Sequence, residues 1–115
     1  MMSDSFLLGL LFDEGYKRMT ITSADEAFEW DEDKAEINIK NHGIRFEEAM
    51  SVFADFGLIT RDDEFHSEYE RREIARGYSL RLRLLTVVFT ERNGKTRIIS
   101  ARLSTLHERK LYESE

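Results

Sequence analysis

The sequence predicts one domain of the α+β class, with a small, mainly antiparallel sheet packed by helices. Helical periodicity occupies residues 31–53, and a run of apolar segments separated by turn residues follows over residues 58–101. Helices followed by hairpin-connected strands are typical of α+β folds. A chain of 115 residues is long enough for one hydrophobic core and too short for two. The predicted order of elements is β-α-α-β-β-β-β-α.

The first half of this order is a short strand and two helices. Residues 28–30 alternate apolar and polar side chains, as a short strand does. Asp31 is the predicted N-cap of the first helix, and Gly43 is predicted to end it. A second helix is expected from Glu47 to about Phe53, with Ala49, Val52 and Phe53 as its apolar stripe.

The second half consists of four strands and a last helix. Strands are expected over residues 58–60, 73–76, 82–90 and 96–101, and the helix over 105–113. A polar loop over residues 62–70 carries His66, and Asn93-Gly94 is a hairpin turn signal. The adjacent Ile98 and Ile99 indicate a central strand covered on both faces.

Residues 1–25 are predicted to be an N-terminal extension, and residues 26–115 the domain proper. The apolar run of residues 6–12 is too short to cross a membrane. It also lacks the basic segment and the small-residue cleavage site of a secretory signal. Two interpretations of the extension stay open: an added strand or helix packed on the domain, or translation from a start codon upstream of a natural start at Met19.

Charge is distributed unevenly along the chain, whose formal net charge is −6. Residues 1–70 hold 18 acids and 6 bases, whereas residues 71–115 hold 5 acids and 11 bases. Such a chain can fold with one basic face, so binding to a polyanion is compatible with the acidic total. The alternative is that the arginines are solvated edges of strands and helices. The absence of cysteine excludes disulfides and thiolate metal sites, and agrees with a cytoplasmic location.

Several short strings lie in one register over residues 28–113. They are Phe28-Glu29-Trp30-Asp31, Lys34-Ala35, Asn38, His42-Gly43-Ile44, Phe46-Glu47-Glu48-Ala49, Thr90-Glu91-Arg92, Arg97-Ile98-Ile99-Ser100-Ala101-Arg102, and then Thr105, Glu108 and Tyr112. Together these strings resemble the BrnT family of bacterial toxins. The resemblance implies a RelE-like ribonuclease that needs no cofactor and is not membrane-bound. It also implies a ribbon-helix-helix antitoxin of the BrnA type as partner, with operator DNA bound only through the toxin–antitoxin complex.

Four positions depart from the family pattern. Asn41 stands where lysine is frequent, with Lys40 one residue earlier, and Arg71 replaces the glutamate of a Glu-Arg pair. Arg76 stands where an apolar residue is usual, and Leu82 where glycine is usual. These departures concern the identity of the acid–base pair more than the fold.

Cleavage of RNA without a metal needs a base for the 2′-hydroxyl, cations for the charge on the phosphorane, and an acid for the leaving 5′-oxygen. The candidates for catalysis are His42, Glu70 and Arg72. Each has a structural alternative: His42 can bond the last carbonyls of its helix, Glu70 can be an exposed loop acid, and Arg72 a surface ion pair. Three scattered histidines do not supply metal-ligand spacing, and Asp31-Glu32-Asp33 suits a helix N-terminus.

The candidates for binding RNA phosphates or bases are Lys40, Arg83, Arg97, Arg102 and Tyr112. Arginine suits phosphate because it stays charged and donates two N–H groups at once. Arg97 and Arg102 are five residues apart, so on an ideal strand they face opposite sides, and one of them is expected to bind the antitoxin or the acidic first half. Surface ion pairs are the alternative for the arginines, and buttressing of the sheet is the alternative for Tyr112.

The leading functional hypothesis is therefore a toxin that cleaves RNA by attack of the 2′-hydroxyl and so inhibits translation and growth. The second is a binding module of the same fold that has lost cleavage and acts with its antitoxin in repressing its own operon. The departures at Asn41 and Arg71 motivate this second hypothesis. A third is an RNA-binding domain without a toxin role.

Overall fold

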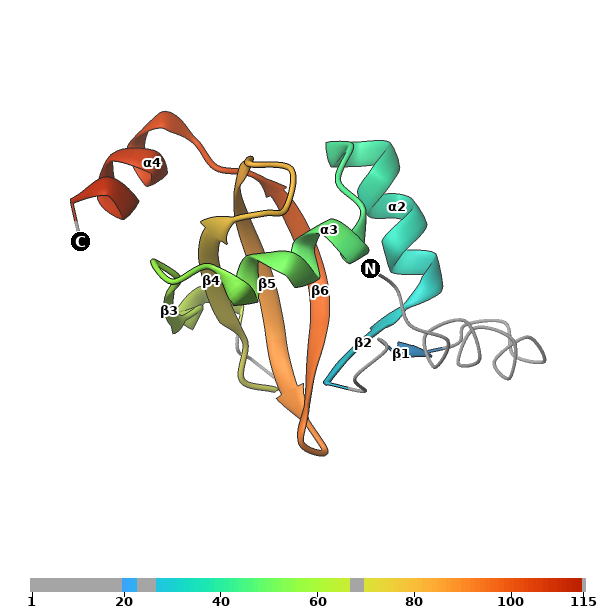
Figure 1. The fold of residues 1–115 in the computed structure, drawn as a ribbon. Helices are drawn as coiled ribbons and strands as arrows, with labels where there is room; N and C mark the ends of the chain where they lie inside the picture. The colour runs from blue at the N-terminus through green and yellow to red at the C-terminus, as the bar shows by residue number, and fades with distance from the viewer. Residues whose placement is uncertain (1–19, 23–26, 67–69, 115) are drawn as a thin grey trace.

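The structure, a computed structural model, describes residues 20–22, 27–66 and 70–114. They form a six-stranded sheet and three helices, so the α+β prediction is confirmed (Figure 1). The elements in chain order are β1 (Thr20–Thr22), β2 (Phe28–Asp31), α2 (Glu32–His42), α3 (Phe46–Ser51), the 3₁₀ turn η1 (Val52–Ala54), β3 (Ile59–Asp62), the 3₁₀ turn η2 (Glu64–His66), β4 (Glu73–Tyr78), β5 (Leu84–Arg92), β6 (Lys95–Leu103) and α4 (Leu106–Glu113). From β2 onward the order of helices and strands is the predicted one.

The strands lie in the order β1-β2-β6-β5-β4-β3. All neighbouring strands are antiparallel except β2 and β6, which run parallel. Residues 20–22 of the predicted extension form β1 at the edge beside β2. The apolar run of residues 6–12 lies outside the described residues. Among the described residues, no helix is long and apolar enough to cross a membrane.

The two ends of α2 are fixed by the residues that the sequence singles out. The carboxylate of Asp31 accepts hydrogen bonds from the backbone N–H of Asp33 at 2.8 Å and of Lys34 at 3.2 Å. Gly43 adopts a left-handed conformation, φ 71°, and its N–H donates to the Ile39 carbonyl at 2.8 Å. Glycine reaches this conformation without steric cost, so the helix ends there as predicted.

The hydrophobic core lies between α3 with η1 and one face of the sheet. Ala49 and Val52 are fully buried, and Phe53 packs at the border of the core, which confirms the predicted stripe. The strands contribute alternating residues such as Val87 and Ala101. Trp30 is 2% exposed and meets Phe46 edge to face, with ring centroids 5.9 Å apart, so its side chain belongs to the core.

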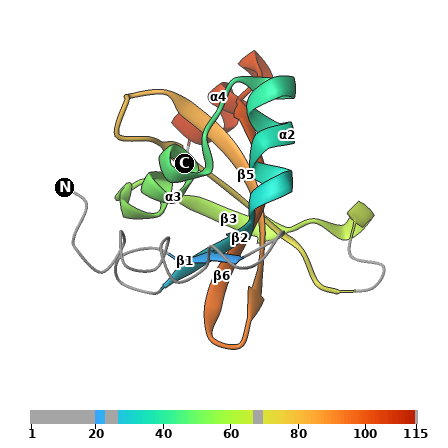
Figure 2. The same cartoon turned by 90° about the vertical axis from the view of Figure 1, so that its right-hand side faces the viewer.

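Helix α2 covers the part of the β6 edge that β2 does not reach (Figure 2). The buried amide of Asn38 carries this contact: its oxygen accepts from the Ala101 N–H at 3.0 Å, and its nitrogen donates to the Ala101 carbonyl at 2.8 Å. The same nitrogen donates to the Ile44 carbonyl at 2.9 Å. Asn38 thus takes the place of a strand residue and satisfies backbone groups that an open sheet edge would leave unpaired.

A β-bulge in β6 corrects two of the predictions. Val88 pairs with Ser100, but the next residue, Phe89, pairs with Ile98, so Ile99 is an extra residue. The extra residue reverses the alternation of side chains along the strand. Arg97 and Arg102 therefore lie on the same face of the sheet, not on opposite faces. Ile98 is buried in the core, whereas Ile99 is only partly buried. The adjacent isoleucines therefore mark a bulge and not a strand that is covered equally on both faces.

The turn between β4 and β5 starts later in the chain than predicted. β4 continues to Tyr78, β5 begins at Leu84, and Leu82 lies in the turn with a left-handed backbone, φ 61°. This conformation explains why glycine is usual at position 82 in the family that the sequence resembles. The other hairpin turn, Asn93-Gly94, was predicted correctly, and both residues have positive φ.

Candidate active site

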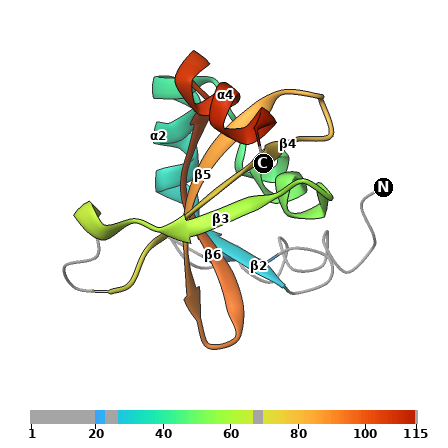
Figure 3. The same cartoon turned by 90° about the vertical axis from the view of Figure 1, so that its left-hand side faces the viewer.

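The face of the sheet opposite the core carries a cross-strand row of polar residues that meets α4. Arg76 of β4 pairs with Thr86 of β5, which pairs with Arg102 of β6. Glu108 of α4 lies against all three side chains. We call these four residues the Glu108 cluster. Helix α4 lies at the end of the sheet where β6 stops (Figure 3), and Figure 1 shows it apart from α2 and α3.

The contacts within the Glu108 cluster are short and directional. Arg102 donates from Nη1 to Oε1 and from Nη2 to Oε2 of Glu108, both at 2.8 Å. Arg76 Nη2 lies 3.3 Å from Oε2 of Glu108, and Arg76 Nε donates to the Thr86 hydroxyl at 3.1 Å. The Thr86 hydroxyl donates in turn to Oε1 of Glu108 at 3.1 Å. The carboxylate is thus held by two guanidinium groups and a hydroxyl, and it also accepts the Thr105 N–H at 2.8 Å in the capping box of α4.

The charged groups of the Glu108 cluster differ in their exposure to solvent, and their pKa values are shifted. The Arg76 side chain is only 6% exposed and that of Glu108 16%, whereas that of Arg102 is 40% exposed. The hydrogen bonds from Arg102 lower the pKa of Glu108 to about 2, against the opposing effect of burial. Burial lowers the pKa of Arg76, and the Glu108 carboxylate opposes that shift. Glu108 is therefore fully ionised at neutral pH and a weak base, and two cations face this single carboxylate.

A second set of contacts attaches the far end of α4. The Tyr112 hydroxyl donates to Oδ2 of Asp55 at 2.6 Å, and Arg109 Nη1 donates to the Tyr78 hydroxyl at 2.9 Å. The rings of Tyr78 and Tyr112 meet edge to face. The hydrogen bond to Asp55 raises the pKa of Tyr112 to about 12. No side chain of α4 is buried, so polar contacts and one aromatic pair hold this helix on the sheet.

Gly57 leaves the space that the Tyr112 hydroxyl fills. A Cβ atom at position 57 would lie 2.5 Å from that hydroxyl. Asp55 also accepts hydrogen bonds from the backbone N–H groups of Gly57 at 3.0 Å and Tyr78 at 2.8 Å. Although burial of Asp55 raises its pKa, these bonds and the one from Tyr112 bring it below the usual value. The Asp55 carboxylate is thus an ionised anchor for α4.

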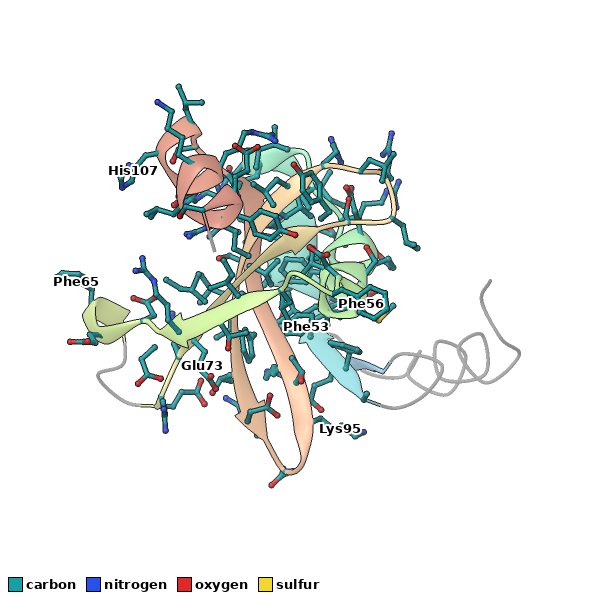
Figure 4. The ribbon with its side chains drawn as sticks, turned by 60° about the vertical axis from the view of Figure 1, so that its left-hand side comes forward. Phe53, Phe56, Phe65, Glu73, Lys95 and His107 are labelled. Atoms are coloured by element: carbon teal, nitrogen blue, oxygen red, sulfur yellow. The ribbon has the colours of Figure 1, made fainter. Side chains whose placement is uncertain are left out.

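A shallow hollow of about 380 Å³ lies farther along the same face, beside β3. It is lined by Arg61, Asp62, Asp63, Glu64, Phe65 and Ile74. Arg61 and Ile74 are cross-strand partners in the row next to that of Arg76. Figure 4 shows Phe65 at the far end, where its ring is 94% exposed, and His107 pointing away from the sheet. An exposed ring beside a cation is a surface on which a nucleobase can stack.

Two groups of predicted site residues come together. Arg102 contacts Glu108 of α4, and Tyr112 belongs to that helix. Glu70, Arg72 and Arg97 form the second group, since the charges of both arginines help to lower the pKa of Glu70. Lys40 and His42 are exposed on the last turn of α2, at the edge of β6. Arg97 lies on the same face as Arg102 and pairs with Glu29 of β2 at 2.9 Å. Figure 2 shows α2 and β2, the two elements that lie along β6.

Arg83, Glu70 and Arg72 each contact other parts of the chain as well. Arg83 pairs with the buried Glu48 of α3, whose pKa it lowers, and so fastens the β4–β5 turn. Glu70 pairs with Arg92 at 2.7 Å, and this bond lowers the pKa of Glu70. Arg72 is half-buried just before β4, and its carbonyl accepts from the Asp63 N–H at 2.9 Å.

Arg76, Thr86 and Glu108 are the residues of the Glu108 cluster that the sequence did not identify as candidates. In the comparison with the family pattern, Arg76 is a charged residue where an apolar one is usual. Glu108 is one of the matching positions in the last helix. The useful signal is the alternation Ile74-Arg76-Tyr78, which puts an arginine on the face opposite the buried Ala75. In the part of the chain that the structure describes, no group of three His, Asp or Glu side chains could hold a metal ion.

Comparisons with known proteins identify the family. Residues 30–108 match the family model described as the ribonuclease toxin BrnT of type II toxin–antitoxin systems. Among solved structures, the crystal structure of the Brucella abortus ribonuclease toxin BrnT is 24% identical, with a TM-score of 0.48 over 66% of this chain and 92% of that one. No curated protein matches the chain. Because the family model spans well over half of its residues, this chain belongs to the BrnT family of ribonuclease toxins, which act within type II toxin–antitoxin systems.

Proposed function

We propose that this chain is a metal-independent endoribonuclease toxin that binds RNA on the open face of the sheet. The observation that carries the proposal is the concentration of arginines on that face: Arg76 and Arg102 share one cross-strand row, Arg61 lies in the next, and the bulge turns Arg97 to the same side. Guanidinium groups bind phosphate through paired N–H donors. The exposed ring of Phe65 offers a stacking surface beside them.

The reaction that fits this face is attack of a 2′-oxygen on the adjacent phosphorus. The new bond joins the 2′-oxygen to phosphorus, the bond from phosphorus to the 5′-oxygen breaks, and a 2′,3′-cyclic phosphate is left. One group takes the proton of the 2′-hydroxyl and another supplies a proton to the 5′-oxygen, while arginines stabilise the charge on the phosphorane. Our candidates for proton transfer are His42 and Glu70, with Arg72 on the phosphate. Lys40, Arg83, Arg97, Arg102 and Tyr112 are our candidates for holding the RNA.

The partner we propose is a ribbon-helix-helix antitoxin of the BrnA type, since a type II toxin requires an antitoxin. The antitoxin neutralises the toxin in the cytoplasm, and the complex rather than the toxin alone binds operator DNA. Growth arrest on expression of this chain, relieved by co-expression of the antitoxin, tests this part of the proposal.

The direct test incubates the purified chain, freed of any partner, with end-labelled RNA in EDTA. We expect cyclic-phosphate ends, and we expect Arg72→Ala to lose them. Arg71→Ala is the matched control, because Arg71 is exposed and pairs with Asp62 at 2.7 Å. Intact RNA with folded protein at high concentration contradicts a ribosome-independent ribonuclease. Equal loss in both variants contradicts the role of Arg72.

A second candidate function is a binding module without cleavage. It is favoured by the pairing of Arg83, Arg97 and Arg102 with carboxylates of this same chain. Paired arginines are partly neutralised and contribute less to binding a polyanion. This function predicts a stable complex with the antitoxin and no cleavage of RNA, alone or on ribosomes.

A further inference from the structure

The buried guanidinium of Arg76 depends on a helix that is weakly attached. A buried cation requires an anion or several acceptors, because leaving it unpaired costs several kcal/mol (about 3–5 when one partner of a buried pair is removed). The carboxylate that pairs with Arg76 comes from Glu108 of α4, at 3.3 Å. The core holds α3 through the buried side chains of Phe46 and Ala49, whereas α4 has no buried side chain.

The carboxylate of Glu108 accepts, from the sheet, hydrogen bonds of the kind that a phosphodiester can also accept. From the sheet it receives two parallel bonds from Arg102, a contact from Arg76 and a bond from the Thr86 hydroxyl. Its bond from the Thr105 N–H belongs to the capping box of α4 itself. Two anionic oxygens bound by a bidentate guanidinium are the arrangement that carboxylate and phosphate share. The same three groups can bind the two non-bridging oxygens of a phosphodiester if α4 moves away.

We propose that Arg76, Arg102 and Thr86 form a binding site for an RNA phosphodiester, which Glu108 occupies in the free protein and vacates when α4 detaches. The inference rests on the proposed function for the choice of RNA as ligand. Helix α4 then acts as an acidic plug that lowers the affinity of the open face for RNA. A helix buried by apolar side chains could not play this role, because detaching it would expose core surface to water.

Tyr112→Phe is the sharpest variant for testing the plug. It removes the bond to Asp55, some distance along α4 from Glu108, and keeps every atom of the Glu108 cluster. The probe is a fluorescent 2′-O-methyl oligonucleotide, which no 2′-oxygen attack can cleave. If α4 vacates the site in about one molecule in ten, opening it fully tightens the apparent Kd about tenfold. Leu111→Ala, an exposed change on the same helix, is expected to leave Kd unchanged.

The gain from Tyr112→Phe must depend on Arg76. Adding Arg76→Met is expected to abolish it, whereas adding Arg81→Met, at an exposed arginine, is expected to preserve it. An unchanged Kd in Tyr112→Phe overturns the proposal. So does a gain that survives Arg76→Met.

Amide hydrogen exchange of the unmodified protein gives a test that needs no variant. We expect the backbone amides of residues 106–113 to exchange faster when the oligonucleotide is bound, because binding displaces α4. Slower exchange of these amides overturns the proposal. So does faster exchange in the presence of inorganic phosphate or of the antitoxin, if the oligonucleotide leaves the exchange rate unchanged. Binding as predicted without cleavage of RNA contradicts the ribonuclease function alone. Cleavage that is indifferent to Arg76 and Tyr112 contradicts the plug alone.

Discussion

Replacing Leu82 by glycine is expected to stabilise the protein. Leu82 has a left-handed backbone, φ 61°, and its side chain is 81% exposed. A side chain other than glycine costs about 1–2 kcal/mol in this conformation. The added freedom of glycine in the unfolded chain costs about 0.5–1 kcal/mol. The exposed side chain contributes little by burial, so the net gain is about 0.5–1 kcal/mol, or a rise in Tm of about 2–8 °C.

Leu80 provides the matched control for this prediction. Its side chain is 83% exposed in the same turn, and its φ is not among the positive ones of the described residues. Leu80→Gly is therefore expected to lower stability by about 0.5–1 kcal/mol, because it adds freedom without relieving strain. Urea and thermal unfolding of both variants measure the difference. Equal destabilisation by the two changes would refute the reasoning that the backbone of Leu82 is strained.

Three further predictions concern the polar contacts. Glu48→Gln is expected to cost about 2 kcal/mol in urea unfolding, because the buried Glu48 holds Arg83, which is one-third exposed and keeps access to water; an unchanged midpoint would contradict this. Gly57→Ala is expected to push the Tyr112 hydroxyl from its anchor, so that its pKa falls from about 12 toward 10 in an ultraviolet titration, with Tyr112→Phe identifying the signal. The pKa of Glu108 is lowered from 4.5 to about 2, so its stabilisation is complete above pH 4.5 and is lost as the pH falls to 2. Glu108→Gln should flatten the stability curve in that window, and a parallel curve would count against the assignment.

Much of the fold could be predicted because its local signals agree. Asp31 and Gly43 define α2 through hydrogen bonds and dihedral angles that depend on neighbouring residues only. Asn93-Gly94 sets its hairpin in the same way. The α+β class, the order of elements and the core stripe of α3 and η1 follow from periodicity.

The rest of the arrangement depends on contacts between residues far apart in the sequence. The bulge at Ile99 is a property of the pairing with β5, and an ideal alternation therefore gave the wrong relation between Arg97 and Arg102. Asn38 matches a helix surface residue in its local pattern, and only the edge of β6 gives it a buried role. The arginines could be identified as candidates, but their acidic partners could not. Those partners decide which arginine is held by the fold and which lies at a ligand site.

The parallel pairing of β2 with β6 constrains when a nascent chain can complete its sheet. The ion pair between Glu29 and Arg97 joins residues 68 positions apart, and the strands β3, β4 and β5 all lie between them in the sequence. A contact of such long range forms only after the intervening chain exists, and it slows folding. While the ribosome is still making β6, β2 lacks its neighbour and Asn38 lacks the backbone groups that it binds. A polypeptide cut short before Arg97 therefore lacks the strand beside β2 and cannot complete this sheet.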